Sequence, residues 1–516
     1  MPQKQVDDAL LQLVRAELIF QHGSPPDAEY SFKHVLVQDA AYSTLLRARR
    51  QQLHGLISVT LEREFSEIVQ THPEVIARHC TEANLVEKAV GYWLKAGQLA
   101  LSRMALPEAI AHLAFGLAMI PKLAESPQRD ALELQVRSAL GTAWWARKGW
   151  MADEIVDALE PALKIVKALG QPGAIIQVLW GLWVYYLIRG RVRQSVPLAE
   201  GALQVAQRAD DEALLVARVI AAATHFWHGE LTEAIKQGDA ILALYDERKH
   251  WHIADQFNHD PKTIAGIYGQ HCLWILGYPA QALDIARSKD EHARRRAHPF
   301  DLGFALTQGS HIYDYLGDAT ALRVRAEEAE RLGAERGLPT FEIMGQALQG
   351  VAQVRAGQYD RAIPVLRAAI ERWHSTGARF WGRYIREVLA EALARSEKID
   401  QGLELCDSGL DEIEQPDCRE RWHYAELLRL RGWMLSLKGD VRDGERSYEA
   451  SLEWARQQRA KSWELRTSMS LARLWRDQGK VPQARELLAP IYGWFTEGLD
   501  TRDLKEAKAL LEQLEA

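Results

Sequence analysis

Glycine recurs about every 40 residues along most of this 516-residue chain, and that spacing limits the possible folds more than any other feature. The recurring position is the residue that ends the first helix of each predicted helix pair. In chain order it is occupied by Met104, Gly149, Gly190, Gly229, Gly277, Gly317, Gly357, Glu397, Gly439 and Gly479. Seven residues before this position, and again five residues after it, eight of the ten repeats carry a small side chain.

Helix packing explains this pattern. Small side chains at the two flanking positions let two helix backbones approach closely, and the glycine between them accepts a tight or left-handed turn. At Gly357 no room is left for a longer loop, so we expect a positive φ there. One helical hairpin cannot bury its apolar face alone, so neighbouring hairpins stack on a shared core. The sequence therefore predicts an all-α solenoid of about ten hairpin units, wound as a right-handed superhelix.

The two ends of the chain depart from the period. Residues 6–20 have the pattern of an amphipathic helix, residues 21–28 carry a turn cluster that favours a β-hairpin, and residues 36–62 have the pattern of a longer helix. Helix, hairpin and helix in this order favour a winged-helix-like segment. We therefore predict three parts: this segment over residues 1–62, the repeat array over 63–498, and a capping helix over 499–516.

The composition favours a folded protein of a reducing compartment. The net charge of −7 gives no basic footprint for nucleic acid. The four cysteines have no CxxC spacing, which argues against a disulfide framework or a zinc knuckle. No signal-peptide pattern opens the chain, so we expect the protein in the cytoplasm.

The apolar run over residues 174–188 raises the question of a membrane span. It has 15 residues, includes Gln177, and is shorter than the ~20 residues that a bilayer crossing needs. A solenoid helix with neighbours on both sides is also apolar all round. We therefore predict a buried helix and no membrane partner.

Tryptophan is unusually frequent, with seventeen in the chain, many of them in repeats two to five. Most of these rings are expected in the core. The alternative is an aromatic-lined concave groove that binds a ligand or a partner, because Trp183 and Gln270 replace the expected small residue and should alter the packing. The residues predicted to line this groove are Trp145, Trp180, Trp183, Tyr186, Trp227, Gln270 and Trp274.

The longest interval between turn glycines contains an insertion over residues 247–262, with His250, His252 and His259. Their spacing defines no tetrahedral metal site. We therefore predict a solvated loop and no metal or other cofactor.

Three stretches of the sequence resemble known families. Gly357, Tyr359, Asp360 and Ala362, followed by Ala369, look like the second helix of a tetratricopeptide repeat (TPR). Both ends of the chain resemble bacterial proteins that join a class III adenylate/guanylate cyclase, an AAA-like STAND ATPase and a TPR array. At the start the residues concerned are Tyr30, Phe32, Lys33, His34, Leu36, Ala41, Tyr42, Leu45, Leu46, Arg50 and His54. At the end they are Tyr492, Gly493, Trp494, Phe495, Gly498, Leu499, Asp500, Leu504, Lys505, Glu506, Ala507 and Lys508.

The resemblance implies the C-terminal half of such a protein: a winged-helix remnant followed by a TPR-like array. It also implies that His34 is the remnant of a nucleotide sensor. The phosphate-binding loop of those ATPases has the pattern G-x-x-x-x-G-K-[ST]. Here the only Gly-Lys pair is Gly479-Lys480, which Val481 follows, and no cyclase domain is recognisable. We therefore predict no catalytic residues and no enzyme activity.

Three functions stay open at this point. The first is a non-catalytic interaction or sensor array that binds a protein partner and regulates an ATPase or cyclase module. The second is a small-molecule sensor that binds its ligand in the tryptophan-rich groove. The third is a fragment of a cyclase or ATPase whose catalytic domains are absent from this chain.

Overall fold

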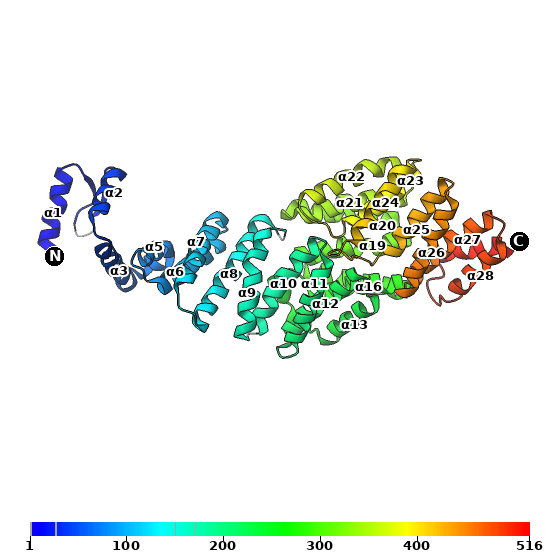
Figure 1. Cartoon of the computed structure of the whole chain (residues 1–516), viewed down its shortest axis with the longest axis horizontal. Helices are drawn as coiled ribbons and strands as arrows, with labels where there is room; N and C mark the ends of the chain where they lie inside the picture. The colour runs from blue at the N-terminus through cyan, green and yellow to red at the C-terminus, as the bar shows by residue number, and fades with distance from the viewer. Residues whose placement is uncertain (1–2, 26–27, 150, 171, 516) are drawn as a thin grey trace. The chain divides into compact units, whose positions relative to one another are not determined.

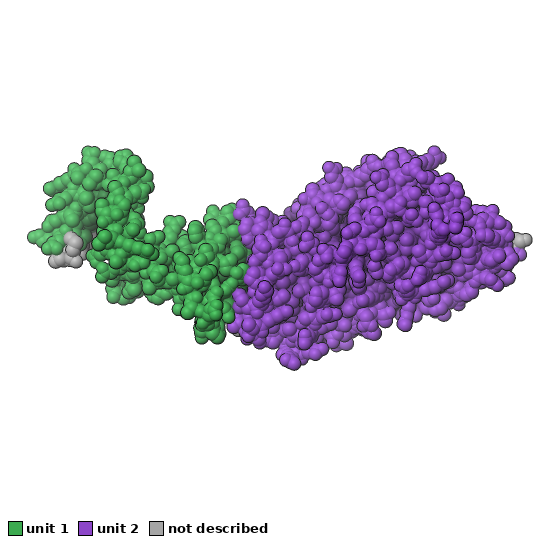
Figure 2. Space-filling view, viewed as in Figure 1, with its two compact units in different colours: residues 1–143 green, residues 144–516 purple. Residues whose placement is uncertain are grey.

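The computed structural model describes residues 3–25, 28–149, 151–170 and 172–515, and helices make up 81% of it. The chain divides into two compact units, unit 1 (Met1–Ala143) and unit 2 (Trp144–Ala516), which Figure 2 colours separately. This division falls inside a helix of the array. The boundaries expected at 62/63 and 498/499 stay predictions.

Unit 1 opens with a helix, a hairpin and two further helices. Its elements are α1 (Gln3–Arg15), β1 (Ile19–His22), β2 (Glu29–Phe32), α2 (Val35–Thr44), α3 (Arg47–Glu64), α4 (Ser66–Thr71), α5 (Pro73–Glu82), α6 (Val86–Ser102), α7 (Leu106–Met119), the 3₁₀ turn η1 (Ile120–Lys122) and most of α8 (Pro127–Lys148). Strands β1 and β2 pair antiparallel, with Ile19 opposite Phe32. The helix predicted over residues 36–62 is interrupted, because Leu45 has an extended backbone between α2 and α3.

Unit 2 is built from helix pairs (Figure 1). Its first half contains α9 (Asp153–Leu169), α10 (Pro172–Ile188), α11 (Val192–Ala206), α12 (Asp211–His228), α13 (Leu231–Leu244), α14 (Glu247–His250), α15 (Ile253–Phe257), α16 (Pro261–Leu276), α17 (Pro279–Arg296), α18 (Pro299–Leu306), the 3₁₀ turn η2 (Gln308–Ser310), α19 (His311–Leu316) and α20 (Ala319–Arg336). Its second half contains α21 (Pro339–Arg355), α22 (Tyr359–Ser375), α23 (Gly382–Arg395), α24 (Ile399–Glu414), α25 (Tyr424–Leu437), α26 (Val441–Gln457), α27 (Lys461–Asp477), α28 (Val481–Tyr492) and α29 (Arg502–Glu515).

The solenoid of TPR-like helical hairpins predicted from the glycine spacing is confirmed. All ten recurring turn residues have a positive φ, from 58° at Met104 to 100° at Gly277. Consecutive helices such as α12 and α13 pack on each other, and α13 then packs on α16. The apolar helix α10 is buried on all sides, and no helix in the described residues is both long enough and apolar enough to cross a bilayer.

One predicted helix is broken. Residues 301–316 form α18, η2 and α19, and Thr307 between them has φ −105° and ψ −84°. The side chain of Gln270 donates to the carbonyl of Gly309 at 2.8 Å, and Nε2 of His271 lies 2.9 Å from the carbonyl oxygen of Gln308. In a continuous helix these carbonyls would accept from backbone amides. The side chains of Gln270 and His271 therefore replace hydrogen bonds that the break removes.

The second half of unit 2 returns along the first half and contacts the ends of its helices. The amides of Arg379 and Phe380 donate to the carbonyl of Ile188 at 2.8 and 3.2 Å. The amide of Arg421 donates to the carbonyl of Trp227 at 2.9 Å. We call these contacts the seam, and define it as residues 188–190 with 379–380, 227–229 with 421–422, 274–277 with 461–462, and 315–317 with 466 and 502.

The last two seam positions use side chains as donors. The hydroxyl of Ser462 donates to the carbonyl of Trp274 at 2.5 Å, and Nη2 of Arg466 donates to the carbonyl of Tyr315 at 2.9 Å. The acceptors are therefore backbone carbonyls at the ends of α10, α12, α16 and α19, where the usual amide partner of a helical carbonyl is missing. The carbonyl of Trp274 also accepts from the amide of the turn residue Gly277 at 3.0 Å. The acceptors Ile188, Trp227, Trp274 and Tyr315 recur every 39–47 residues, and on the opposite side the positions 380, 421, 462 and 502 recur about every 40 residues, so one set of turns meets the other in register. Arg466 lies four residues after Ser462 on α27 and adds a second donor there.

We expect a seam glycine to be less replaceable than a turn glycine that faces solvent. A Cβ built on Gly277 would lie 2.5 Å from Cζ3 of Trp494 and 2.8 Å from Cβ of Lys461, whereas one on Gly357 would meet nothing within 4 Å. Gly357→Ala should cost about 1–2 kcal/mol for its left-handed backbone alone. Gly277→Ala should cost about 2–4 kcal/mol, because the contacting atoms must also move.

Urea unfolding followed by tryptophan fluorescence measures the two costs. Hydrogen exchange locates the damage. For Gly277→Ala it should rise near both 274–280 and 458–463, which are about 185 residues apart but joined by the seam. Equal costs for the two variants, or damage restricted to one repeat, would contradict the seam.

Candidate functional site

The seam encloses an aromatic cluster that both halves of unit 2 supply. Phe226 and Trp227 lie against Trp422, with ring centroids 5.3 and 6.0 Å apart. At the next seam position, Trp274 lies 5.0 Å from Trp463 and stacks on Tyr315 at 4.3 Å. Trp227 and Trp422 are each 1% exposed. The inner surface of the first half is therefore covered by side chains of the second half.

This arrangement decides where the predicted groove residues lie. Five of the seven are buried: Trp180, Trp183, Trp227, Gln270 and Trp274. Trp145 and Tyr186 are partly exposed, and the Tyr186 hydroxyl donates to Glu160 at 2.6 Å. The five line a closed interior instead of an open groove. The returning half of the chain covers Trp227 and Trp274, and other parts of the first half cover Trp180 and Trp183. Ligand binding by these residues stays a prediction that requires the seam to open.

The two residues that replace an expected small side chain have structural partners. Nε1 of Trp183 donates to the hydroxyl of Thr224 at 2.8 Å, and Gln270 holds the broken helix at Gly309. Trp227 likewise donates to the hydroxyl of Tyr268 at 3.1 Å. The donor nitrogens of these side chains are therefore used by the fold, whereas Oε1 of Gln270 is buried without a hydrogen-bond partner.

The insertion over residues 247–262 is folded, so the prediction of a solvated loop is wrong. It forms α14 and α15, and His250 within it is buried. Phe257 and His259 contact Trp180 with ring centroids 5.4 and 5.2 Å apart. Asp260, which is fully buried, accepts from Tyr245 at 2.5 Å. The insertion thus covers Trp180, which explains why this ring does not face solvent.

Beside the aromatic cluster lies a cluster of buried charges. Arg355 bonds Asp314 at 2.5 Å and Glu391 at 2.6 Å, and Nδ1 of His423 lies 2.6 Å from Oε2 of Glu387. Burial would raise the pKa of Glu391, but the Arg355 guanidinium lowers it to about 2. Burial would lower the pKa of His423, but Glu387 and then Glu420 raise it to about 9.

The chemistry of this charged cluster is structural. Its acids and bases bond one another, and the space that they and their neighbours enclose is about 10 Å³. That is about the space of one water molecule, so the cluster has no room for a substrate. Buried charges are tolerated only when paired in this way.

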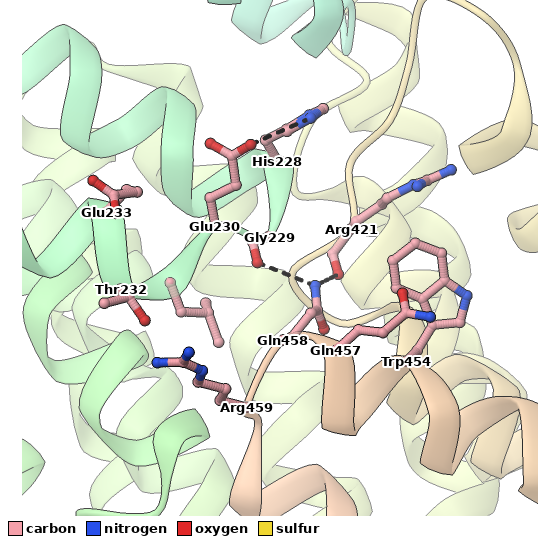
Figure 3. Close-up of a pocket in the computed structure, with 11 residues that line it drawn as sticks. His228, Gly229, Glu230, Thr232, Glu233, Arg421, Trp454, Gln457, Gln458 and Arg459 are labelled. Atoms are coloured by element: carbon pink, nitrogen blue, oxygen red, sulfur yellow. Dashed lines mark hydrogen bonds and ion pairs between the residues drawn. The ribbon is translucent and has the colours of Figure 1, made fainter.

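A larger pocket of about 340 Å³ lies at the edge of the seam (Figure 3). One wall is the turn between α12 and α13. The other is the loop before α25 together with the end of α26. The lining residues are His228, Gly229, Glu230, Leu231, Thr232, Glu233, Arg421, Trp454, Gln457, Gln458 and Arg459. Nε2 of Gln458 joins the walls, because it donates to the carbonyls of Gly229 at 3.3 Å and Arg421 at 3.0 Å.

The sequence did not identify this pocket. The nearest seam pair in it, Gly229 and Arg421, is 192 residues apart in the chain, so no local motif links its walls. The charged cluster did leave a signal in the sequence, because Arg383, Glu387 and Glu391 follow one another at four-residue spacing on α23, where a solenoid helix should be apolar.

The remaining site predictions concern His34 and metal ions. His34 precedes α2, is exposed, and its side chain makes no capping hydrogen bond. Its role as a nucleotide-sensor remnant stays a prediction. Within the described ranges no group of three or more His, Cys, Asp or Glu side chains is placed to hold a metal ion. The cysteines Cys80, Cys272, Cys406 and Cys418 are free and buried, and burial raises the pKa of each thiol.

Comparison with known proteins identifies one curated relative. An uncharacterized protein of Rhizobium meliloti (strain 1021) is 27% identical over 411 residues, which cover 69% of this chain and 39% of that protein. The chain thus spans 39% of the length of this relative. No family model matches the chain.

Several solved structures of low similarity also match. The crystal structure of a Rap protein complexed with Competence and Sporulation Factor has a TM-score of 0.42 and 10% identity, over 66% of this chain and 97% of that chain. The APC/C hetero-tetramer Cut9–Hcn1 has a TM-score of 0.40 and 10% identity, over 94% of this chain and 99% of that chain. Similarities at this level do not bear on the function of the chain.

Protonation of the histidines inside the seam should weaken unit 2. Burial lowers the pKa of His311 to about 3, and it also lowers the pKa of His271. Because these folded pKa values lie below the unfolded value of about 6.5, their contribution to stability is complete above pH 6.5 and is lost as the pH falls toward 3. For each histidine that stays neutral in the fold, the free energy of unfolding should be about 1.4 kcal/mol lower at pH 5.5 than at pH 7.5.

The variant His311→Gln tests this, since an amide can still accept from Nε1 of Trp381, which lies 2.7 Å from Nε2 of His311. Urea unfolding at pH 7.5 and pH 5.5 should show that the variant loses about 1 kcal/mol less than the unmodified protein on acidification. The matched control is His22→Gln, in the exposed hairpin. An unchanged pH dependence in His311→Gln would contradict the burial of a neutral histidine at the seam.

Proposed function

We propose that this chain is a non-catalytic, cytoplasmic helical-repeat array that docks on a protein partner and regulates an ATPase or cyclase signalling module. The module and the array are either parts of one polypeptide or separate proteins. The resemblance of both ends of the chain to the cyclase–STAND ATPase–TPR proteins supports this proposal. The greater length of the Rhizobium meliloti relative is consistent with a further module in such a protein.

One observation carries the proposal: the start of unit 1 exposes a large number of apolar side chains. Over residues 4–72, with 26 and 27 left aside, only Ile19 and Ser58 are buried. The exposed large apolar side chains of this segment are Leu11, Leu13, Leu18, Phe20, Phe32, Val35, Leu36, Tyr42, Leu46, Leu56, Ile57, Val59, Phe65 and Ile68. We call this set the N-terminal apolar surface.

Such exposure is costly for a protein in water. Leu36 and Leu46 are 76% and 80% exposed, and fully burying a leucine stabilises by about 1.5–3 kcal/mol. Contiguous exposed apolar patches mark interaction sites. The N-terminal apolar surface therefore fits a protein partner better than a soluble ligand, which would need a concave site.

A docking surface in unit 1 is consistent with the filled interior of unit 2. The inner face of a repeat array is the usual docking surface, but here the seam covers it. His34 precedes Val35 and Leu36, so a docked nucleotide-binding module would meet His34 at the same surface. We propose this contact as the remaining use of the nucleotide-sensor residue.

Site-specific cross-linking tests the docking. A photo-reactive amino acid at Leu36 or at Leu46 should cross-link, in source-cell extract, to a protein segment that carries a nucleotide-binding or cyclase domain. The matched control places the same amino acid at Val324, which is 51% exposed on α20 of unit 2, and should give no such product. Cross-linking to the same protein from Val324, or to proteins without such a domain, would contradict the proposal.

The isolated chain should hydrolyse no ATP and cyclise no nucleotide, because no phosphate-binding loop holds the phosphates. The measurement is phosphate release and cyclic-nucleotide formation by the purified chain, with the Lys480→Ala variant as control for the only Gly-Lys pair. Turnover that follows the protein peak in two independent preparations would show that the chain is an enzyme.

A further inference from the structure

We propose that the pocket at the edge of the seam binds a small anionic ligand, with phosphate or carboxylate oxygens, and that this ligand holds the seam closed. The inference goes beyond the docking function and does not depend on it. It assigns the ligand to the pocket of Figure 3 and not to the tryptophan interior. The volume of about 340 Å³ is in the range of small-molecule sites, about 300–1,000 Å³.

The charges of the lining residues favour an anion. The guanidinium of Arg459 is exposed and has no ion-pair or hydrogen-bond partner among the described residues. Arg421 lies over the ring of Trp454 at 4.6 Å, and its Nη2 pairs with the half-exposed Glu414 at 3.1 Å. Arginine binds phosphate and carboxylate oxygens through its planar donors.

The two acids of the pocket are engaged by neighbouring side chains. Glu233 pairs with Nζ of Lys236 at 2.5 Å. Glu230 lies 2.6 Å from Nδ1 of His225, and this hydrogen bond lowers the pKa of Glu230, which stays ionised. A ligand anion would therefore bind against Arg459 and Arg421 on the opposite wall.

Unsatisfied polar atoms gather around the same cavity. Nδ1 of His228 and Nε of Arg421 are buried and have no hydrogen-bond partner in the described structure. Buried polar atoms normally have a partner. Two such nitrogens on residues that line one cavity are consistent with a site that a ligand oxygen completes.

Closure of the seam follows from the position of the site. The ligand would touch the turn at Gly229 in the first half and the residues around Arg421 and Gln458 in the second half. A ligand that needs both walls binds only the closed form, and so shifts the population toward it. The pocket directly adjoins the hydrogen bond between the Arg421 amide and the Trp227 carbonyl. Ligand binding should therefore slow amide exchange at Arg421 more than elsewhere.

The experiment uses the full chain with three probes: inorganic phosphate, citrate and adenosine monophosphate, each against sodium chloride at matched ionic strength. At least one probe should raise the melting temperature and slow amide exchange at Arg421 at least three-fold. The variant Arg459→Gln should lose both effects, whereas Arg442→Gln should keep them, because Arg442 is exposed at the start of α26 and Arg459 follows the end of that helix.

The outcomes separate the sources of the anion and test both parts of the proposal. A response to phosphate and adenosine monophosphate alone assigns a phosphate ligand, and a response to citrate alone assigns a carboxylate ligand. No response to any probe, or an equal response in Arg459→Gln, would overturn the site. Binding that depends on Arg459 but leaves the exchange at Arg421 unchanged would overturn the coupling to the seam.

Discussion

The last carbonyl groups of an α-helix have no partner inside the helix, and in unit 2 the chain itself supplies the missing donors. Carbonyls at the ends of α10, α12, α16 and α19 bond to the returning second half. Because both sides of the seam follow the same period, one contact places the next in register. The covered tryptophans, the occupied inner face and the edge pocket all depend on this arrangement.

The charged cluster gives the seam a further role beyond stability. A buried ion pair gains little net free energy over an apolar pair, since both charges lose their water. It does penalise wrong pairings. If the second half were displaced by one repeat, Asp314 would lose the hydroxyl of Tyr384, and Arg466 would lose the carbonyl of Tyr315. Charges that now have partners would then be left alone in the interior. We infer that the cluster selects the register, while the aromatic cluster supplies most of the burial.

The parts of this fold that the sequence predicted are those set by local chemistry. A positive φ at a turn depends on a few neighbouring residues, so the ten turn positions and the helix pairs followed from the spacing. The seam depends on residues about 190 positions apart, and no period in the sequence states that two inner faces will meet. For the same reason the groove around Trp227 was expected to be open. Trp183 and Gln270 were correctly singled out as departures, but their partners became visible only in the structure.

Closure also changes how a repeat array responds to a ligand. In an open solenoid each repeat contacts only its neighbours, and a local perturbation stays local. In unit 2, four contacts join repeats that are distant in the chain, so opening one of them strains the register of the others. A ligand of modest affinity at Gly229 and Arg421 can therefore act on the whole interior, including the rings around Trp274. The proposed ligand would in this way transmit a signal through the conformation of the array.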